Sequence, residues 1–267
     1  NGHRNVFFAK RGARILPIGA FEQVGVEGSG GLYWYLRRAN GFSIPHTTGR
    51  TSGTDWRDYD PNVESLLEIF QGMRDSYEYP EAPRPKRLWS PWLDPSKPVP
   101  RASSSENSPS FRRLGFARNA LEKGYKLGFI ASSDHISTHI SYACLIAERL
   151  TPESLVEAIM ARRAYAATDN IILDVRYCGS DGAHLMGEVF ESSTPVRIQA
   201  KIIGTDEIQQ VDLIKNGGTL HIYRPNLPQF EFEFVDREVK SGESYYYLRV
   251  IQKDGEMAWG SPVWVTY

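Results

Sequence analysis

Cysteine is scarce in this chain, and long apolar runs are absent. Cys144 and Cys178 are the only cysteines among 267 residues, which excludes a disulfide framework and any CxxC metal-binding spacing. Their apolar surroundings predict buried thiols. The apolar runs at residues 15–18 and 202–203 are too short to cross a bilayer. We therefore expect a soluble protein without a membrane-spanning segment.

An excess of charge of either sign is missing too. The chain has 31 Lys and Arg against 32 Asp and Glu, a formal net charge of -1. The sequence lacks a basic stripe of the kind that would predict nucleic-acid binding. The short basic run at residues 84–87 indicates a solvated loop. Hydrophobic residues make up 41% and charged residues 24%. This composition is typical of a globular protein with one large domain or two ordinary ones.

The first residues contain neither an initiator Met nor a signal peptide. Residues 1–8 read like the interior of a domain, so we expect a longer parent protein in which further chain precedes them. Any targeting signal would belong to that part. The sequence indicates neither the compartment nor the oligomeric state.

Helical and strand-like segments alternate over the first part of the chain. Eight prolines within residues 79–110 predict a long surface loop or lid there. Thr151 followed by Pro152 is typical of a helix N-terminus, and that helix should run to about residue 163. Other helices are predicted at residues 32–39 and 111–123, and strands at residues 6–8, 15–18, 42–44, 66–70, 127–131 and 171–175.

The helical period disappears beyond about residue 190. Short strands separated by Gly, Asn and Pro favour a small β-sandwich, and the alternation at residues 245–249 predicts a sheet with one covered face. We therefore expect an α/β domain over residues 1–190 and an all-β domain over residues 191–267. The predicted strands of the second domain are residues 196–203, 208–215, 219–223, 230–235, 244–252 and 262–267.

Imidazole and carboxylate side chains stand at the ends of predicted strands. His46, Asp134 and His135 follow such strands, and His3 directly precedes one. Because the C-terminal ends of strands in an α/β sheet or barrel share one pocket, we expect these groups to converge. They are ligands that Zn²⁺, Mn²⁺ or Fe accepts, and a bound metal activates water. The alternative is that each histidine is an ordinary hydrogen-bonded structural residue.

Several short motifs follow one another along nearly the whole chain. They are Gly2-His3-Arg4-Asn5-Val6, Ile44-Pro45-His46-Thr47, Glu68-Ile69-Phe70-Gln71 with Glu78, Leu127 to His135, Ala161 to Thr168, Met186-Gly187-Glu188, Tyr245 to Val250 and Ala258 to Pro262. In this order they resemble the polymerase-and-histidinol-phosphatase (PHP) superfamily, and specifically a large branch that appends a C-terminal β-domain.

The resemblance implies a fold and a set of metal ligands. The expected fold is α/β: the C-terminal part of a distorted (β/α) PHP-type barrel, followed by the small all-β sandwich. His3, His46 and Asp134 match metal ligands of the family. The family closes with Asp-x-His, whereas this chain has Asp134-His135, so His135 and His139 stay open as the source of the imidazole. The family's opening His-x-His motif and bridging Glu would lie before residue 1.

Three further residues are candidates for substrate binding. Arg50 could hold an anionic group in bidentate fashion, or could be a solvated loop residue. Glu68 and Glu78, with Gln71 near them, could line the pocket or could be ordinary polar groups at strand ends.

The resulting hypothesis is a metal-dependent hydrolase of a small-molecule or phosphoester substrate, by resemblance a phosphoesterase that acts through metal-activated water. Cleavage of an ester or amide bond stays open, because a fold does not fix the chemistry, and no acid or base is assigned. The alternative hypothesis is a non-catalytic module that binds a glycan or a protein. In that case Tyr245, Tyr247 and Trp259 of the β-domain would form the binding surface.

Overall fold

The computed structural model describes residues 2–14, 29–49, 53–54, 56–72, 78–85, 113–134 and 139–267, and β-strands dominate this part of the chain. The helices are α1 (Gly30–Ala39), α2 (Ala117–Glu122), preceded by a 3₁₀ turn at Arg113–Gly115, and α3 (Pro152–Met160). The strands are β1 (Arg4–Phe8), β2 (Gly41–Pro45), β3 (Leu66–Gln71), β4 (Gly128–Ser132), β5 (Tyr142–Leu145), β6 (Ala164–Ala167), β7 (Ile172–Cys178), β8 (Ala183–His184), β9 (Val189–Glu191), β10 (Arg197–Lys215), β11 (Gly218–Tyr223), β12 (Leu227–Val235), β13 (Glu243–Gln252), β14 (Met257–Gly260) and β15 (Val263–Thr266).

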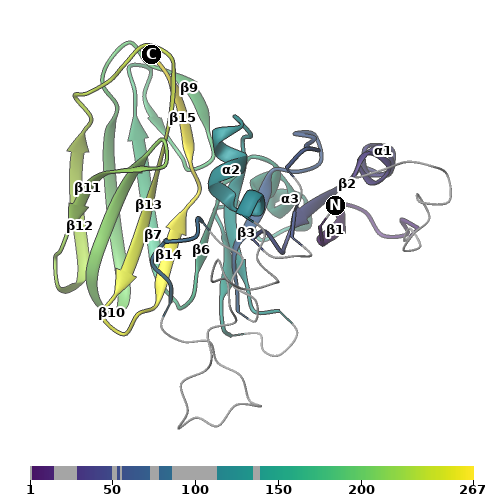
Figure 1. The fold of residues 1–267 in the computed structure, drawn as a ribbon, viewed down its shortest axis with the longest axis horizontal. Helices are drawn as coiled ribbons and strands as arrows, with labels where there is room; N and C mark the ends of the chain where they lie inside the picture. The colour runs from purple at the N-terminus through teal and green to yellow at the C-terminus, as the bar shows by residue number, and fades with distance from the viewer. Residues whose placement is uncertain are drawn as a thin grey trace, which may run out of the picture.

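One curled sheet of eleven strands, β5 to β15, forms the larger part of the fold (Figure 1). Its central strand, β10, is 19 residues long and changes partners along its length. The first half pairs with β7 and β12, and the second half pairs with β13 and β11. The register shifts between Ile203 and Ile208, where the predicted strands at residues 196–203 and 208–215 prove to be one bent strand. Such an irregularity lets a strand bend, so the sheet curls around its own core.

Strand β13 shows why the sheet is stable on both sides. Tyr246 and Leu248 point into the core enclosed by the curled sheet. Tyr245 and Tyr247 point the other way, into a second core that contains Phe129 of β4. Successive side chains of a strand alternate between faces, so both faces of β13 are buried. The prediction of one covered face is therefore wrong, because β3, β4 and α2 cover the face that was expected to meet solvent.

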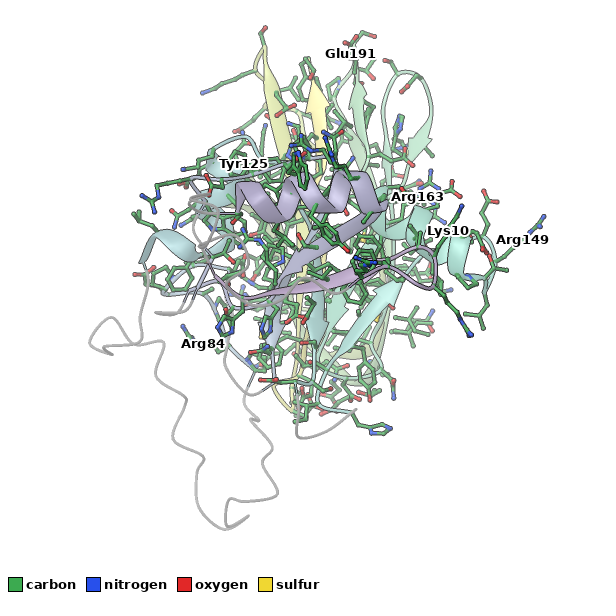
Figure 2. The ribbon with its side chains drawn as sticks, turned by 90° about the vertical axis from the view of Figure 1, so that its right-hand side faces the viewer. Lys10, Arg84, Tyr125, Arg149, Arg163 and Glu191 are labelled. Carbon is green, nitrogen blue, oxygen red and sulfur yellow. The ribbon has the colours of Figure 1, made fainter. Side chains whose placement is uncertain are left out.

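The remaining strands lie on the side of that second core. β3 and β4 form a parallel pair, and β1 and β2 form an antiparallel pair. Figure 1 shows α2, α3 and β3 next to the large sheet and α1, β1 and β2 farther out. Figure 2 views the molecule from the side of α1, which lies in front of the sheets.

Local sequence signals for the helices are confirmed where the structure describes them. The Thr151 hydroxyl accepts a hydrogen bond from the backbone N–H of Ser154 at 3.3 Å, which caps α3. Helix α1 ends at Asn40, whose φ of 52° is the left-handed conformation that an Asn tolerates at a helix end. The predicted helix at residues 111–123 is shorter than expected, because its first described turn is 3₁₀.

The predicted (β/α) barrel is wrong. Such a barrel needs a succession of parallel strands separated by helices, whereas the described strands are mainly antiparallel and only β3–β4 and β9–β15 pair in parallel. The all-β character predicted for the C-terminal part agrees with the structure. However, the boundary expected at residue 190 falls inside the eleven-stranded sheet, since β5 to β9 precede it and pair with strands that follow.

Three smaller expectations concern the loops and the cysteines. The predicted strand at residues 15–18 and most of the loop at residues 79–110 lie outside the described residues. Cys144 and Cys178 are both free and only half-buried, and burial raises the pKa of the Cys144 thiol. Each helix in the described part is too short or too polar to cross a bilayer.

Candidate functional site

The predicted site residues His3 and His46 are neighbours in space. In the β1–β2 pair Arg4 lies opposite Pro45, so the residue before β1 meets the residue after β2. The backbone N–H of His46 donates to the His3 carbonyl oxygen at 3.1 Å, and the two imidazole rings stack with centroids 5.7 Å apart at 21°. Two histidines that are 43 positions apart in the sequence therefore form one pair of rings.

Strand β3 brings two polar side chains to His46. The Nε2 atom of Gln71 lies 2.5 Å from Nδ1 of His46, and Oε2 of Glu68 lies 3.7 Å from the same nitrogen. Glu68 also accepts hydrogen bonds from Asn5 Nδ2 and from Ser132 Oγ of β4, each at 2.9 Å. We call the residues His3, Asn5, His46, Glu68, Gln71 and Ser132 the His46 cluster. They come from β1, β2, β3, β4 and the segments next to them.

Burial differs within the His46 cluster. Gln71 and Glu68 are almost fully buried, at 0% and 2% exposure. The His46 side chain keeps 16% of its surface exposed, so it is the more accessible group beside two enclosed polar side chains. A carboxylate close to an imidazole in a mostly buried place orients the ring and stabilises positive charge on it.

Asp134 follows the same edge of the β3–β4 pair. Gln71 lies opposite Ser132 in this parallel pair, and the backbone N–H of Gly72 donates to the Ser132 carbonyl at 2.8 Å. Because parallel strands end on the same side, Asp134, two residues later, lies at the edge where the His46 cluster sits. Its φ of 61° is left-handed, which turns the chain sharply after β4.

The other two predicted imidazoles, His135 and His139, belong to the segment that follows β4. His135 lies outside the described residues. His139 is exposed and directly precedes Ile140, whose backbone N–H donates to Ser133 Oγ at 3.0 Å. The chain therefore returns to the end of β4 at this point.

The loop after His46 is packed too tightly for larger residues. A Cβ on Gly115 would lie 1.9 Å from the Thr48 carbonyl oxygen, and one on Gly2 would lie 2.5 Å from Cα of Thr54. Gly2 also has a φ of 107°, which favours glycine. The backbone N–H of Thr54 donates to the Thr47 carbonyl at 2.7 Å and closes the loop. Arg50, the predicted anion-binding residue, lies outside the described residues.

Glu78 lies in a different environment from Glu68. Its carboxylate accepts hydrogen bonds from Arg249 at 2.8 Å, from the Trp259 indole at 3.3 Å and from the Tyr247 hydroxyl. Glu78 is 1% exposed, and these contacts occupy both of its oxygens. The described contacts therefore indicate a structural role between the loop and the large sheet, and they leave no oxygen directed at a substrate.

The predicted metal centre is not formed by the described residues. Among them, no group of three His, Cys, Asp or Glu side chains is arranged so that it could hold a metal ion. The expected set of His3, His46 and Asp134 is therefore not such a group. The described residues therefore do not support a zinc or manganese centre in a TIM-like barrel, and a bound metal stays a prediction.

Sequence reasoning found part of the cluster and missed part of it. His3, His46, Glu68 and Gln71 stand in the motifs singled out above. Asn5 and Ser132 also stand in those motifs without an assigned role, although Ser132 is the polar end of the apolar strand β4 and Asn5 directly precedes the apolar part of β1. That contrast is a signal that could have found them.

The aromatic surface of the alternative hypothesis is not available. Tyr245, Tyr247 and Trp259 are 8%, 3% and 0% exposed. They lie in the core between β13, β14 and the β3–β4 pair, so they cannot stack against a glycan or a protein. The Tyr247 hydroxyl donates a hydrogen bond to Glu78. Burial, and to a smaller extent the charge of this carboxylate, raise the pKa of Tyr247 well above its usual value.

Comparison with known proteins finds relatives in Chlamydia species. No family model matches the chain, and no solved structure matches it. An uncharacterized protein of Chlamydia pneumoniae is 29% identical over 243 residues, and one of Chlamydia muridarum is 26% identical over 251 residues. A third, from Chlamydia trachomatis, is 25% identical over 251 residues. Each alignment covers 84% of this chain and 38% of the relative, so the chain spans well under half of these proteins. The resemblance to the PHP superfamily stays a prediction.

Proposed function

We propose that this chain is part of a hydrolase and that the His46 cluster belongs to its reaction centre. The observation that carries the proposal is the environment of one imidazole. His46 is partly exposed, its Nδ1 lies between Gln71 and Glu68, and a second imidazole, His3, stacks on it. Because the two nitrogens of an imidazole point in diverging directions, contacts at Nδ1 leave Nε2 directed away from Gln71 and Glu68.

The chemistry follows from this arrangement. An imidazole whose Nδ1 is oriented by a buried polar group can take a proton from water at Nε2, and the Glu68 carboxylate stabilises the resulting positive charge. General-base catalysis of this kind contributes roughly 10²- to 10⁴-fold to a rate. Asn5 and Ser132 donate to Glu68 and hold the carboxylate in place.

Phosphoesters are the first substrate class to test, because the motif resemblance points to them. The divalent metal stays an untested prediction. The described residues do not form a three-ligand group, so no step above depends on a metal. Elemental analysis of the purified full-length protein for zinc, manganese and iron measures it directly.

The decisive experiment is hydrolysis of a chromogenic phosphoester by the full-length protein, with and without added divalent metal ions. We expect turnover that His46→Gln and Glu68→Gln each reduce, by about 10²-fold or more for His46→Gln. His221→Gln is the matched control, because His221 is an exposed histidine on β11 in the curled sheet. Two results would count against the proposal. One is turnover that survives in His46→Gln, and the other is a wild-type protein without turnover under every metal condition.

A further inference from the structure

The Gln71 side chain has an unusual position that the proposed reaction does not by itself explain. It is fully buried, and its Nε2 lies 2.5 Å from His46 Nδ1. Within the described part of the chain, its carbonyl oxygen Oε1 is a buried atom without a hydrogen-bond partner. A buried polar atom left unsatisfied costs about 1–3 kcal/mol.

A glutamine amide offers a carbonyl oxygen and an NH₂ group of nearly the same shape, and its hydrogen bonds decide which of them faces a neighbour. If NH₂ faces His46, Nδ1 must carry a lone pair. That lone pair would then also face the Glu68 carboxylate oxygen 3.7 Å away, which is repulsive. If the amide is turned over, Oε1 accepts a hydrogen bond from Nδ1–H, and the NH₂ group takes the place where the carbonyl oxygen meets no donor. The Nδ1–H dipole of His46 then also points toward the region of the negative charge on Glu68.

We propose that Gln71 is a positioning residue that accepts the Nδ1–H of His46 and thereby fixes the Nδ1–H tautomer of this imidazole. Nε2 then carries the lone pair. This inference rests on the proposed function for its purpose, since a base needs that lone pair. The tautomer itself can be measured without any substrate.

The test is the ¹⁵N spectrum of the histidine side chains in the intact protein, recorded at about pH 9, where an ordinary imidazole is neutral. The His46 signals are identified by their loss in His46→Gln. We expect the protonated-nitrogen signal at Nδ1 and the lone-pair signal at Nε2. The opposite pattern, with the proton on Nε2, would overturn the inference whether or not the protein hydrolyses anything.

Two variants separate hydrogen bonding from packing. Gln71→Glu keeps an acceptor at this place and should keep the Nδ1–H pattern. Gln71→Leu removes the acceptor and should lose it, giving signals averaged between the tautomers. Gln199→Leu, on the exposed side of β10, is the matched control and should leave the His46 signals unchanged. An unchanged pattern in Gln71→Leu would also overturn the inference. A measured Nδ1–H tautomer in a protein without hydrolytic activity would instead leave Gln71 positioning intact and remove the proposed function.

Discussion

Arg249 of β13 donates hydrogen bonds from Nη1 to Glu78 Oε2 at 2.8 Å and from Nη2 to Asp212 Oδ2 at 2.7 Å. One buried guanidinium thus holds two buried carboxylates, one from a loop and one from β10. Burial alone would lower the pKa of Arg249, but the charges of Glu78 and Asp212 outweigh it and raise that pKa above its usual value. These contacts of Arg249 join the β3–β4 side of the molecule, where Glu78 lies, to the large sheet.

This arrangement predicts an asymmetry between two substitutions. Arg249→Met leaves two buried carboxylates facing each other, and we expect it to lower the free energy of unfolding by about 3–5 kcal/mol. Glu78→Gln leaves Arg249 paired with Asp212 and should cost less, about 1–3 kcal/mol. Urea denaturation followed by tryptophan fluorescence measures both values. Lys201→Met is the control, because its ion pair with Glu231 is about half exposed on both sides and solvent screening should leave it with little effect on stability. Equal costs for all three variants would contradict this interpretation of the buried network.

Asp236 predicts how stability depends on pH. Burial would raise its pKa, but hydrogen bonds from Lys215 at 2.5 Å and from the Tyr246 hydroxyl at 2.7 Å outweigh this and lower the pKa below the ordinary 3.8. A carboxyl group whose pKa is lower in the folded state binds protons more weakly there than in the unfolded chain. Its contribution to stability is therefore complete above the unfolded value and is lost as the pH falls through the folded value.

The corresponding measurement compares the wild type with Asp236→Asn between about pH 2 and pH 7, a range that brackets the usual pKa of an aspartate. The substitution should reduce stability most at neutral pH and flatten the loss of stability at acid pH. If the two proteins differed by the same amount at every pH, ionisation of Asp236 would not be the source of the effect. Asp174→Asn is a suitable control, because Asp174 is more than half exposed.

The boundary at residue 190 marks what local pattern can and cannot predict. The change from helical to strand-like periodicity is real, and most strands after residue 190 were predicted near their observed places. Pairing across the boundary was not predictable, because β6 pairs with β14 and β7 with β10 through contacts between residues far apart in the sequence. β6 has only four residues, too few for the alternation of a strand to stand out from its surroundings.

The His46 cluster shows the same limit at the level of single residues. The positions of His3 and His46 at strand ends were visible in the sequence and led to the expectation that they would meet. The partner of His46 depends on register: β3 happens to present both Glu68 and Gln71 to the same imidazole, and a bulge between Glu68 and Phe70 accompanies this. Strict alternation would have placed Glu68 and Gln71 on opposite faces, so no periodicity argument could have joined them.

Cutting the chain at residue 190 tests the pairing across that position. A fragment of residues 191–267 lacks β7, whose Leu173, Val175 and Tyr177 fill the core of the curled sheet. It also loses β6 and β9, which pair with β14 and β15 on the edge away from β13. We expect this fragment to bind a hydrophobic dye and to unfold without a cooperative transition, as partly packed chains do. A sharp thermal transition and well-dispersed NMR signals from the fragment would show instead that residues 191–267 form a domain by themselves.

Gly115 connects packing to the candidate site. A Cβ at this position would lie 1.9 Å from the Thr48 carbonyl oxygen and 3.3 Å from that of Thr54, and both contacts are to backbone that a rotamer change cannot move. Gly115→Ala should therefore push the loop after His46 outward. We expect a loss of about 1–3 kcal/mol in the free energy of unfolding, typical of overpacking. The ¹⁵N signals of His46 should also change, since Thr47 and Thr48 directly follow it.

Gly30 supplies the matched control for Gly115. It is the first residue of α1, its φ is not in the left-handed region, and nothing lies within 4 Å of a Cβ placed there. Gly30→Ala should be neutral or stabilising by up to about 1 kcal/mol, because alanine reduces the freedom of the unfolded chain. If Gly115→Ala behaved like Gly30→Ala and left the His46 signals in place, the close approach between residues 48 and 115 could not be what holds the loop beside the His46 cluster.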